Sequence, residues 1–549
     1  MVIQAYDSEN KIRPGVYVKT IVEPNNNANE TGLGATAIGL EMSWGEEGKL
    51  IEMDQANYFA GNYKSVIGYS LSNTNKTLPY TLALSNCNTA YFYRLNRGGV
   101  KATGTLGSGD NLITFNAKYT GKVGNSIKII ITADKPIVGK HRLDVLVDNV
   151  KEESYTLSSA ADLKTIKSNW INIIVGENIS TITTTAGLSL TGGTDGSTTT
   201  AGVKASVEVG ALKFEAKTAG ASGNSLSVVI SENGTDADKF DLSIYNGNTE
   251  VESFDSLADV AAFLAITSTY VDISNGSGSA IIITAGSQLT GGSDATNYLG
   301  YFFDSLTYKH INTIAIDDDD ADTQLALANW AIEQNIKGKD IQAVVIDNAA
   351  DNESIITTKN QGYKVGNLYE VTPSLFTLLV AGARAGCPLN QSLASRTIVN
   401  ATEIINPVAD EDVEELLNQG FFLLTYDIDG TVCIEEDQNS LISYTDDKPE
   451  DLKFNQVYAV KAFVNYQTAL VFRNYLGKFT NIDSVRKQIK SDIIVSVYDY
   501  LLRLGAIEPY DSDSDITISR KDARSALVDE YFQVTQTLTK LFVRSHIKF

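Results

Sequence analysis

The chain has 549 residues, of which 44 are Lys or Arg and 67 are Asp or Glu, so its formal net charge is −23. A single hydrophobic core stops growing at about 250–300 residues, so this length predicts several domains. The acidic balance argues against a nucleic-acid scaffold, because neutralising phosphates requires clustered Lys and Arg.

The first predicted element is a β-strand near the start of the chain. A turn signal, Arg13-Pro14-Gly15, precedes a run that is rich in β-branched side chains. The neighbouring residues offer no obvious strand with which this run could pair. The run consists of Val16, Tyr17, Val18, Lys19, Thr20, Ile21 and Val22.

Strands and helices alternate in two segments that flank the middle of the chain. Buried-type strands followed by acidic helix starts are typical of βα units in a parallel or mixed sheet. The expected strands are residues 35–40, 90–94, 313–316 and 342–347, the expected helices are 78–85, 323–334 and 374–385, and a hairpin turn at 427–430 joins strands 423–426 and 431–435.

Between these segments the sequence repeats with a period of 99 residues. Phe115-Asn116-Ala117-Lys118 returns as Phe214-Glu215-Ala216-Lys217, and Leu190-Thr191-Gly192-Gly193 returns as Leu289-Thr290-Gly291-Gly292. Each copy contains strands, a Gly-Asn turn and a short helix-like piece. We therefore expect two copies of a small, mostly β domain.

The last hundred residues start as helix and end as strand. From residue 465 the pattern is helical, and an apolar stripe recurs every four residues up to a predicted left-handed cap at Gly505. Residues 516–549 then return to strand alternation, and four of the five alternate positions on one side of the last nine residues are apolar: Leu541, Val543, Ile547 and Phe549. The nine residues of this last predicted strand are Leu541, Phe542, Val543, Arg544, Ser545, His546, Ile547, Lys548 and Phe549.

A search for catalytic or metal-binding chemistry finds no candidate. The histidines, His141, His310 and His546, have no Ser, Cys or ligand partner nearby in sequence. The acidic run at 317–320 is interpreted as a helix start, where carboxylates cap free amides, and not as a magnesium site. The alternating aspartates at 511, 513 and 515 lack the glycine of a calcium loop and are interpreted as a solvated loop. We expect no enzyme activity, cofactor or metal.

Several blocks of the sequence resemble the tail sheath proteins of contractile-tailed bacteriophages and phage-tail-like bacteriocins, in the form found in phages of Gram-positive hosts. The blocks occur in the order of that family and span nearly the whole chain. They are residues 13–18, 35–40 with Trp44-Gly45, 93–99, 117–126 with 190–196, 381–392, 474–486 and 500–507. The inserted β domain is present twice, which departs from the family minimum.

The resemblance implies an α/β and α+β multidomain fold. Its expected parts are an N-terminal arm (1–24), a discontinuous sheath core with a mixed sheet (25–100 and 297–450), two inserted β domains (101–196 and 197–296) and a C-terminal domain with a terminal strand arm (451–549). It also implies a structural subunit that stacks helically around a tail tube. In this family, both terminal arms add strands to sheets of neighbouring subunits, and contraction drives the tube through the target envelope.

The resemblance further implies partners and a location. The expected partners are copies of the same chain, the tail tube protein, and baseplate and tail terminator proteins, with no direct nucleic-acid contact. The expected location is the virion tail or a bacteriocin particle, assembled in the host cytoplasm. A tube-facing surface is expected in the C-terminal domain, although a solvated helix face is the alternative. Its candidate residues are Arg486, Lys487, Lys490 and Arg503.

Three alternatives remain at this point. The two terminal strands could be ordinary edge strands of one domain. The Thr- and Gly-rich β repeats could belong to a surface adhesin or carbohydrate-binding protein, but the chain starts without the pattern of a secretory signal. An α/β hydrolase-like enzyme would need a nucleophile elbow or metal carboxylates near residues 313–347, and none is found.

The longest apolar stretch, 375–383, is far shorter than the roughly 20 residues of a membrane span. Three scattered cysteines, Cys87, Cys387 and Cys433, favour synthesis in a reducing cytoplasm.

Overall fold

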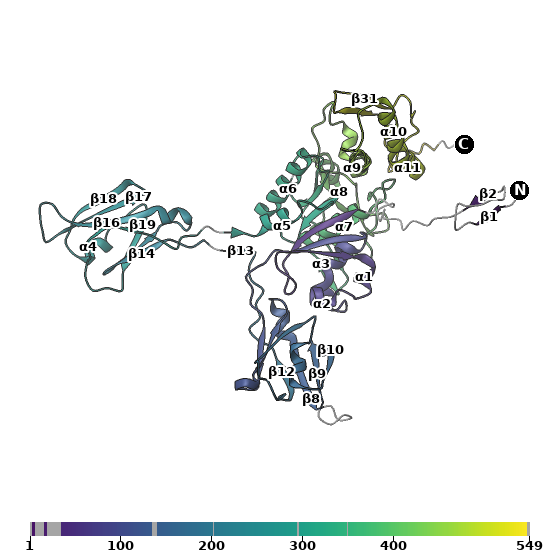
Figure 1. Ribbon diagram of the computed structural model, residues 1–549. Coiled ribbons are helices and arrows are strands. Elements are labelled where there is room, and N and C mark those ends of the chain that lie inside the picture. Colours follow the sequence, from purple (N-terminus) through teal and green to yellow (C-terminus); the bar gives the residue numbers. More distant parts are fainter. Residues whose placement is uncertain are drawn as a thin grey trace.

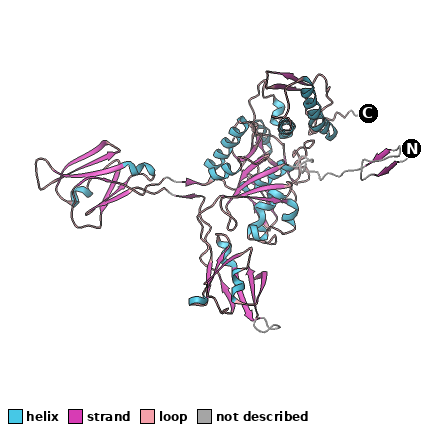
Figure 2. Ribbon diagram, viewed as in Figure 1, coloured by secondary structure: helices cyan, strands magenta, loops and turns pink. Residues whose placement is uncertain are grey.

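A computed structural model describes residues 3–5, 16–18, 34–133, 140–200, 202–293, 296–348 and 350–545 of the chain. Four units are visible in Figure 1: a central α/β core, two β units that project from it, and a smaller C-terminal unit packed on the core. Figure 2 shows that helices concentrate in the core and the C-terminal unit, whereas both projecting units are mostly strand.

The core is built on a seven-stranded sheet that joins distant parts of the sequence. Six neighbouring strands are parallel, and the edge strand β4 is antiparallel to β5. Strand β3 pairs with β22, so the two flanking segments of the chain form one sheet. The strands in spatial order are β28 (Phe421–Phe422), β24 (Ile355–Thr358), β23 (Gln342–Ile346), β22 (Thr313–Ile316), β3 (Ala35–Leu40), β5 (Thr89–Arg94) and β4 (Leu50–Asp54). The expected strands at 35–40, 90–94, 313–316 and 342–347 are confirmed within one residue.

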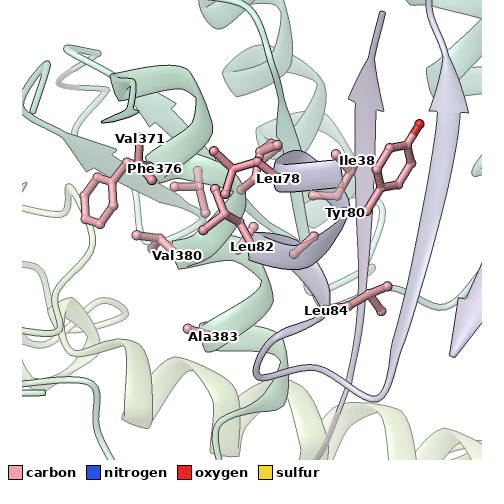
Figure 3. Close-up of a cluster of buried hydrophobic side chains, with 14 of the residues drawn as sticks. Ile38, Leu78, Tyr80, Leu82, Leu84, Val371, Phe376, Val380 and Ala383 are labelled. Atoms are coloured by element: carbon pink, nitrogen blue, oxygen red, sulfur yellow. The ribbon is translucent and has the colours of Figure 1, made fainter. Parts of the chain in front are cut away.

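Helices cover both faces of this sheet. Helices α3 (Thr74–Leu84) and α7 (Pro373–Gly386) pack together on one face, where their apolar side chains meet those of β3 (Figure 3). Helices α5 (Leu299–Ser305) and α6 (Ala321–Ile336) cover the other face. A Cβ on Gly386 would lie 1.5 Å from the Asn86 backbone oxygen, so the end of α7 needs glycine to approach this closely.

Shorter elements complete the core. Helices α1 (Gln55–Phe59) and α2 (Lys64–Ile67) lie before α3, and the acidic helix α8 (Asp410–Asn418) packs near β28. A three-stranded sheet contains β26 (Tyr369–Val371), β25 (Gly362–Val365) and β27 (Glu403–Ile405). The expected hairpin is present as β29 (Leu424–Tyr426) and β30 (Val432–Ile434).

The acidic run after β22 is a helix start, as expected. The Asp320 side chain accepts a hydrogen bond from the Thr323 amide at 2.9 Å and caps α6. Asp317 is half-buried and accepts a hydrogen bond from the Ser374 hydroxyl at 2.8 Å, and its pKa is raised mainly by desolvation. Across the described residues, no group of three or more His, Cys, Asp or Glu side chains converges as a metal site would require.

The 99-residue repeat folds as two similar two-sheet units. Copy 1 has sheets β10-β9-β8-β12 and β11-β7-β6, and copy 2 has the equivalent sheets β18-β17-β16-β20 and β19-β15-β14. In copy 1, the Asn125 amide donates to the Gly193 backbone oxygen at 2.9 Å and its side-chain oxygen accepts from the Gly193 amide at 2.8 Å. Asn224 and Gly292 make the same pair of bonds in copy 2. These paired hydrogen bonds explain why both the Asn and its Gly partner recur in the second copy of the repeat.

The elements of the two units correspond in order. Copy 1 contains β6 (Thr103–Leu106), β7 (Ile113–Ala117), β8 (Ile127–Ala133), β9 (His141–Val147), β10 (Val150–Leu157), a short helical turn at Ala160–Lys164, β11 (Ile171–Val175) and β12 (Thr185–Ser189). Copy 2 contains β14 (Ser206–Val209), β15 (Leu212–Ala216), β16 (Leu226–Glu232), β17 (Phe240–Asn246), β18 (Thr249–Leu257), α4 (Val260–Leu264), β19 (Val271–Asn275) and β20 (Thr284–Gln288).

The two copies are attached to the core in different ways. Copy 1 packs against Trp44 of the core, which contacts Tyr119 and Trp170 with ring centroids 5.3 and 5.5 Å apart. Copy 2 is joined through a short two-stranded ribbon, β13 (Thr199–Thr200) with β21 (Thr296–Asn297), and stands away from the core in Figure 1. The position of Tyr119 is occupied in copy 2 by Thr218, and that of Trp170 by Tyr270. Copy 2 therefore keeps an aromatic side chain at only one of the two positions that contact Trp44 in copy 1.

The C-terminal unit is helical at first and ends in a short hairpin. Helix α9 (Asn455–Arg473) begins ahead of residue 465, where the sequence pattern placed the start of helix. Helices α10 (Asp483–Ile493) and α11 (Asp499–Leu504) follow, and Gly505 is the left-handed cap that was expected, with φ of 73°. The strand alternation predicted over 516–549 forms regular strands only as β31 (Ile516–Arg520) and β32 (Ala526–Glu530) within the described residues.

The apolar stripe every four residues has a structural cause that the sequence analysis missed. An α-helix advances about 100° per residue, so side chains four apart drift by about 40° around the axis. Residues Ile494–Tyr498 instead form a π-helical turn between α10 and α11. This wider turn compensates the drift. Ile489, Ile493, Val497 and Leu501 are consequently all buried on one face.

Candidate assembly interface

The C-terminal hairpin presents two open β edges. Strands β31 and β32 form a sheet of only two strands, so each has one edge without a strand partner among the described residues. Ile516, Ile518 and Val528 point to the helices of this unit and pack in its core. Leu527, on the other face, is 46% exposed. One face is therefore anchored, while both edges can accept an added strand.

The chain leaves this unit as an exposed apolar segment. Val534 bridges to Ile507, and the side chain of Gln456 donates to the Thr535 backbone oxygen at 3.0 Å and accepts from the Thr537 amide at 3.2 Å. Beyond this anchor, Leu538, Leu541, Phe542 and Val543 are between 74% and 90% exposed. A stretch of large apolar side chains held in water is unusual unless a partner covers it.

The predicted C-terminal arm lies partly in this segment. Leu541, Phe542, Val543, Arg544 and Ser545 are exposed and belong to no strand. His546, Ile547, Lys548 and Phe549 lie outside the described residues. The extended strand predicted here stays a prediction, because an arm of this kind would acquire its strand partner from another copy.

The predicted N-terminal arm contains a strand that already has a partner. Strand β2 (Val16–Val18) pairs in parallel with β1 (Ile3–Ala5), and this small ribbon lies apart from the core in Figure 1. The expectation that this run has no partner nearby in the sequence is wrong, because residues 3–5 also adopt the extended backbone and supply the ladder. Lys19, Thr20, Ile21 and Val22 lie outside the described residues.

The four candidate tube-facing cations do not form one free patch. The Arg486 side chain is 14% exposed and donates to the Asn481 side-chain oxygen at 2.8 Å. Lys490 approaches the Asp513 backbone oxygen at 3.5 Å, and Arg503 donates to the Asp499 backbone oxygen at 3.2 Å. Lys487 is 76% exposed and pairs with Asp483 at 2.8 Å. Of the four, Lys487 and Arg503 are exposed, whereas Arg486 and Lys490 are half-buried.

A buried ionic network joins the core to the C-terminal unit. The Arg384 guanidinium on α7 donates to Asp437 at 2.7 Å, and both side chains are at most 2% exposed. Asp437 also accepts from the Leu393 amide and from the Asn455 side chain, each at 2.9 Å. Asn455 opens α9 and accepts from Gln342 of β23 at 2.8 Å. Sequence analysis singled out residues 381–392 by resemblance alone and did not find this network.

The loop with alternating aspartates is closed by its own backbone. Asp515 accepts a hydrogen bond from the Asp511 amide at 2.7 Å, and Asp511 accepts from the Asp513 amide at 2.9 Å. These bonds hold the carboxylates against their own loop, as the solvated-loop interpretation expected. No helix within the described ranges is long and apolar enough to cross a membrane.

Burial of an acid at the hairpin makes the stability of this unit depend on pH. Glu530 ends β32, accepts from the Thr468 hydroxyl at 3.2 Å, and has its pKa raised above 4.5 mainly by burial. A raised folded pKa means that ionisation opposes folding, so this contribution is favourable below pH 4.5 and is lost as the pH rises through the folded pKa.

We therefore expect Glu530→Gln to raise the urea midpoint at pH 8 and to lose this advantage as the pH falls towards 4.5. Glutamine keeps an oxygen that can accept from Thr468. The exposed Glu508→Gln serves as the control and should leave the midpoint unchanged at both pH values. A gain for Glu530→Gln that grows on acidification would contradict the assignment.

Comparison with known proteins identifies the family. The model of the phage tail sheath protein β-sandwich domain matches twice, over residues 97–195 and 199–294. The models of the central domain and of the C-terminal domain match residues 290–440 and 447–548. The chain belongs to the phage tail sheath protein family. This family is structural and not enzymatic, and the matches lend no support to the adhesin alternative.

Individual relatives agree with this assignment. Phage-like element PBSX protein XkdK of Bacillus subtilis (strain 168) is 28% identical over 374 residues, which cover 62% of this chain and 79% of that protein. The sheath tail protein of Desulfitobacterium hafniense shares the fold with a TM-score of 0.65 at 23% identity, over 97% of this chain and 100% of that chain. The sheath tail protein of Listeria innocua has a TM-score of 0.64 at 20% identity, over 92% of each chain. The expected multidomain α/β sheath architecture is confirmed.

Proposed function

We propose that this sheath protein polymerises helically around a tail tube by exchanging strands between copies. Residues 16–22 and 541–549 of one copy would add to the open edges of β31 and β32 in neighbouring copies. The observation that carries the proposal is the two-stranded hairpin, whose apolar face is buried while both outer edges have no strand partner among the described residues. The exposed segment from Leu538 to Val543 supplies apolar side chains for the added strand.

Strand addition suits a polymer of identical subunits. Backbone hydrogen bonds provide the attachment, and alternate side chains set the register. A head-to-tail contact of this kind does not close on itself and therefore builds open helices. It also covers strand edges that would otherwise aggregate.

The remaining parts of the proposal concern organisation and partners. We propose domain boundaries at 1–24, 25–100 with 297–450, 101–196, 197–296 and 451–549, which the family matches support. The proposed partners are the tail tube, through a face that includes Lys487, and baseplate and tail terminator proteins. The particle would be a phage tail or a bacteriocin, assembled in the host cytoplasm. Contraction would draw its energy from better burial between rigid units, with the arms as tethers.

Deletion of residues 541–549 tests the proposal. The truncated protein should remain folded, because the Gln456 anchor at Thr535 and Thr537 is retained, but it should form no sheath. Negative-stain electron microscopy and sedimentation would compare it with the full chain, and circular dichroism would confirm folding. A control deletion of residues 134–139, which lie between β8 and β9 in the sequence, should leave assembly intact. Normal tubes from the truncated protein would reject strand exchange by this arm.

A further inference from the structure

A cleft of about 460 Å³ lies between the core and α9, and we call it the seam cleft. Residues at or just before the start of β3, β22 and β23, such as Gly34, Asn312 and Ile341, line one side. Side chains of α9 line the other. The cleft has the size of a typical small binding site, which spans about 300–1,000 Å³.

The seam cleft combines aromatic surface with unpaired positive charge. The His310 ring stacks on Tyr466 with centroids 3.6 Å apart, and Tyr308 beside it is 97% exposed. Lys339 and Arg473 also line the cleft, and neither forms an ion pair within the described part of the chain, although Lys339 donates to the Thr307 backbone oxygen at 2.9 Å. The acid in the lining, Asp340, is paired with Lys461 at 3.1 Å. In a chain of net charge −23, such a cleft suits an apolar group flanked by carboxylates.

Such a group stands on the surface of the same chain. Ile428, in the turn between β29 and β30, is 101% exposed and is flanked by Asp427 and Asp429. We call these three residues the Ile428 knob. Neither aspartate forms an ion pair among the residues that the structure describes. An aliphatic side chain held entirely in water between two carboxylates gains by burial against a cationic, aromatic partner.

The turn that carries the knob is well ordered by its own hydrogen bonds. The Asp427 amide donates to the Thr431 backbone oxygen, and the Gly430 amide donates to the Asp427 backbone oxygen, both at 2.8 Å. The Thr431 amide donates to Asp429 at 3.0 Å, and bonds from Thr431 lower the pKa of Asp429. The knob therefore loses little conformational entropy on binding, because these hydrogen bonds already hold its backbone.

Knob and cleft lie at opposite ends of the central sheet. Strand β28 runs parallel to β24, β23 and β22. The cleft lies at the amino ends of β22 and β23, whereas the knob follows β28 through β29 and therefore lies beyond the carboxyl ends. Its location at the far end of the sheet prevents a copy from filling its own cleft, so any contact joins two copies and leaves both ends of the pair free.

We propose that the Ile428 knob of one copy inserts into the seam cleft of the next, with Asp427 and Asp429 facing Lys339 and Arg473. This contact rests on the proposed self-assembly of the chain and adds to it a side-chain lock between the α/β cores. It is separate from strand exchange, which uses the C-terminal hairpin and the arms.

Charge exchange between the two surfaces tests the pairing. Variant K carries Asp427→Lys and Asp429→Lys, and variant C carries Lys339→Glu and Arg473→Glu. Each is expected to raise the protein concentration needed for tube assembly by at least about tenfold, measured by sedimentation and electron microscopy. Their combination in one chain should restore assembly towards the wild-type concentration. Leu368→Asp, which alters a 78% exposed residue between β25 and β26, is the control and should assemble normally.

Disulfide cross-linking provides a test that does not need tubes. A chain with Ile428→Cys is mixed with a chain with Ala469→Cys, because Ala469 is an exposed residue of the cleft wall. Oxidation should give a covalent heterodimer, while each chain alone should stay largely monomeric on a denaturing gel. The native cysteines Cys87, Cys387 and Cys433 are buried and should not interfere.

The outcomes separate this contact from strand exchange. Normal assembly of variants K and C, or no cross-linked heterodimer, would overturn the knob-in-cleft contact even if deletion of 541–549 abolishes tubes. Failure of the combined variant to recover would overturn the proposed charge pairing. Tubes formed by the 541–549 deletion would reject strand exchange by that arm, while the cross-link would still report on the knob.

Discussion

Replacing Asp437 with alanine is expected to lower the free energy of unfolding by about 3–5 kcal/mol. The substitution leaves the Arg384 guanidinium buried without its carboxylate, and it also removes the acceptor of the Leu393 amide and the Asn455 side chain. An uncompensated buried charge carries the full cost of its desolvation. Urea unfolding monitored by circular dichroism measures the change.

Two further variants distinguish the charge from the shape of the side chain. Asp437→Asn keeps an oxygen acceptor but removes the charge, so its free energy of unfolding should lie between those of the wild type and the alanine variant. Asp446→Ala removes an exposed aspartate near the same segment and should change the free energy of unfolding by less than about 0.5 kcal/mol. An alanine variant at 437 as stable as the wild type would mean that the network contributes nothing to the seam between the core and the C-terminal unit.

Replacing Trp44 with alanine is expected to detach copy 1 from the core at a cost of about 3–5 kcal/mol. Trp44 is fully buried, donates from its indole nitrogen to the Ser65 backbone oxygen at 2.9 Å, and contacts Tyr119 and Trp170. Copy 1 should keep its own fold, because Trp44 lies in one buried cluster with its core but the side chains between its two sheets, such as Phe115 and Ile129, all remain. Limited proteolysis should then cut the connection near residues 97–102 faster than in the wild type.

The duplicated unit supplies the control for this experiment. Tyr270 occupies the position of Trp170 in copy 2, the unit that stands away from the core in Figure 1. Tyr270→Ala should therefore leave proteolysis at residues 97–102 unchanged. Equal cleavage in the Trp44 variant and the wild type would show that other contacts, such as those of Arg94 with the backbone oxygens of Thr120 and Asp195, suffice to hold copy 1.

Much of the local structure followed from the order of residues along the chain. The Asp320 carboxylate after β22 caps α6, Gly505 ends α11, and a Gly-Asn turn recurs in each copy of the repeat. These features rest on backbone preference and on bonds from side chains to nearby backbone, which act within a few residues or recur identically in each copy. The same ordered motifs carried the resemblance to the sheath family.

Where sequence reasoning failed, a competing contact decided the outcome. The stripe of four-residue spacing was interpreted as one helix, but the chain forms a π-helical turn within it. This turn keeps Ile493 and Val497 on the buried face. The run at 16–22 was expected to lack a nearby partner, but residues 3–5 pair with its first three residues. In both cases the sequence pattern predicted the local structure correctly, but it did not show which residues that structure would pack against or pair with.

The sequence by itself determined a multidomain α/β architecture with a duplicated β domain and, through its ordered motifs, the resemblance to the sheath family, whereas the strand-like arms remain a prediction. Tertiary structure alone decided that β3 pairs with β22 across 277 residues, that copy 1 docks on Trp44 while copy 2 stands on a ribbon, and that Arg384 and Asp437 meet. It also placed the Ile428 knob and the seam cleft at opposite ends of one sheet. The reason is physical: local preferences act over a few residues, whereas partners distant in sequence are selected by burial of apolar surface and pairing of buried polar groups in the whole fold.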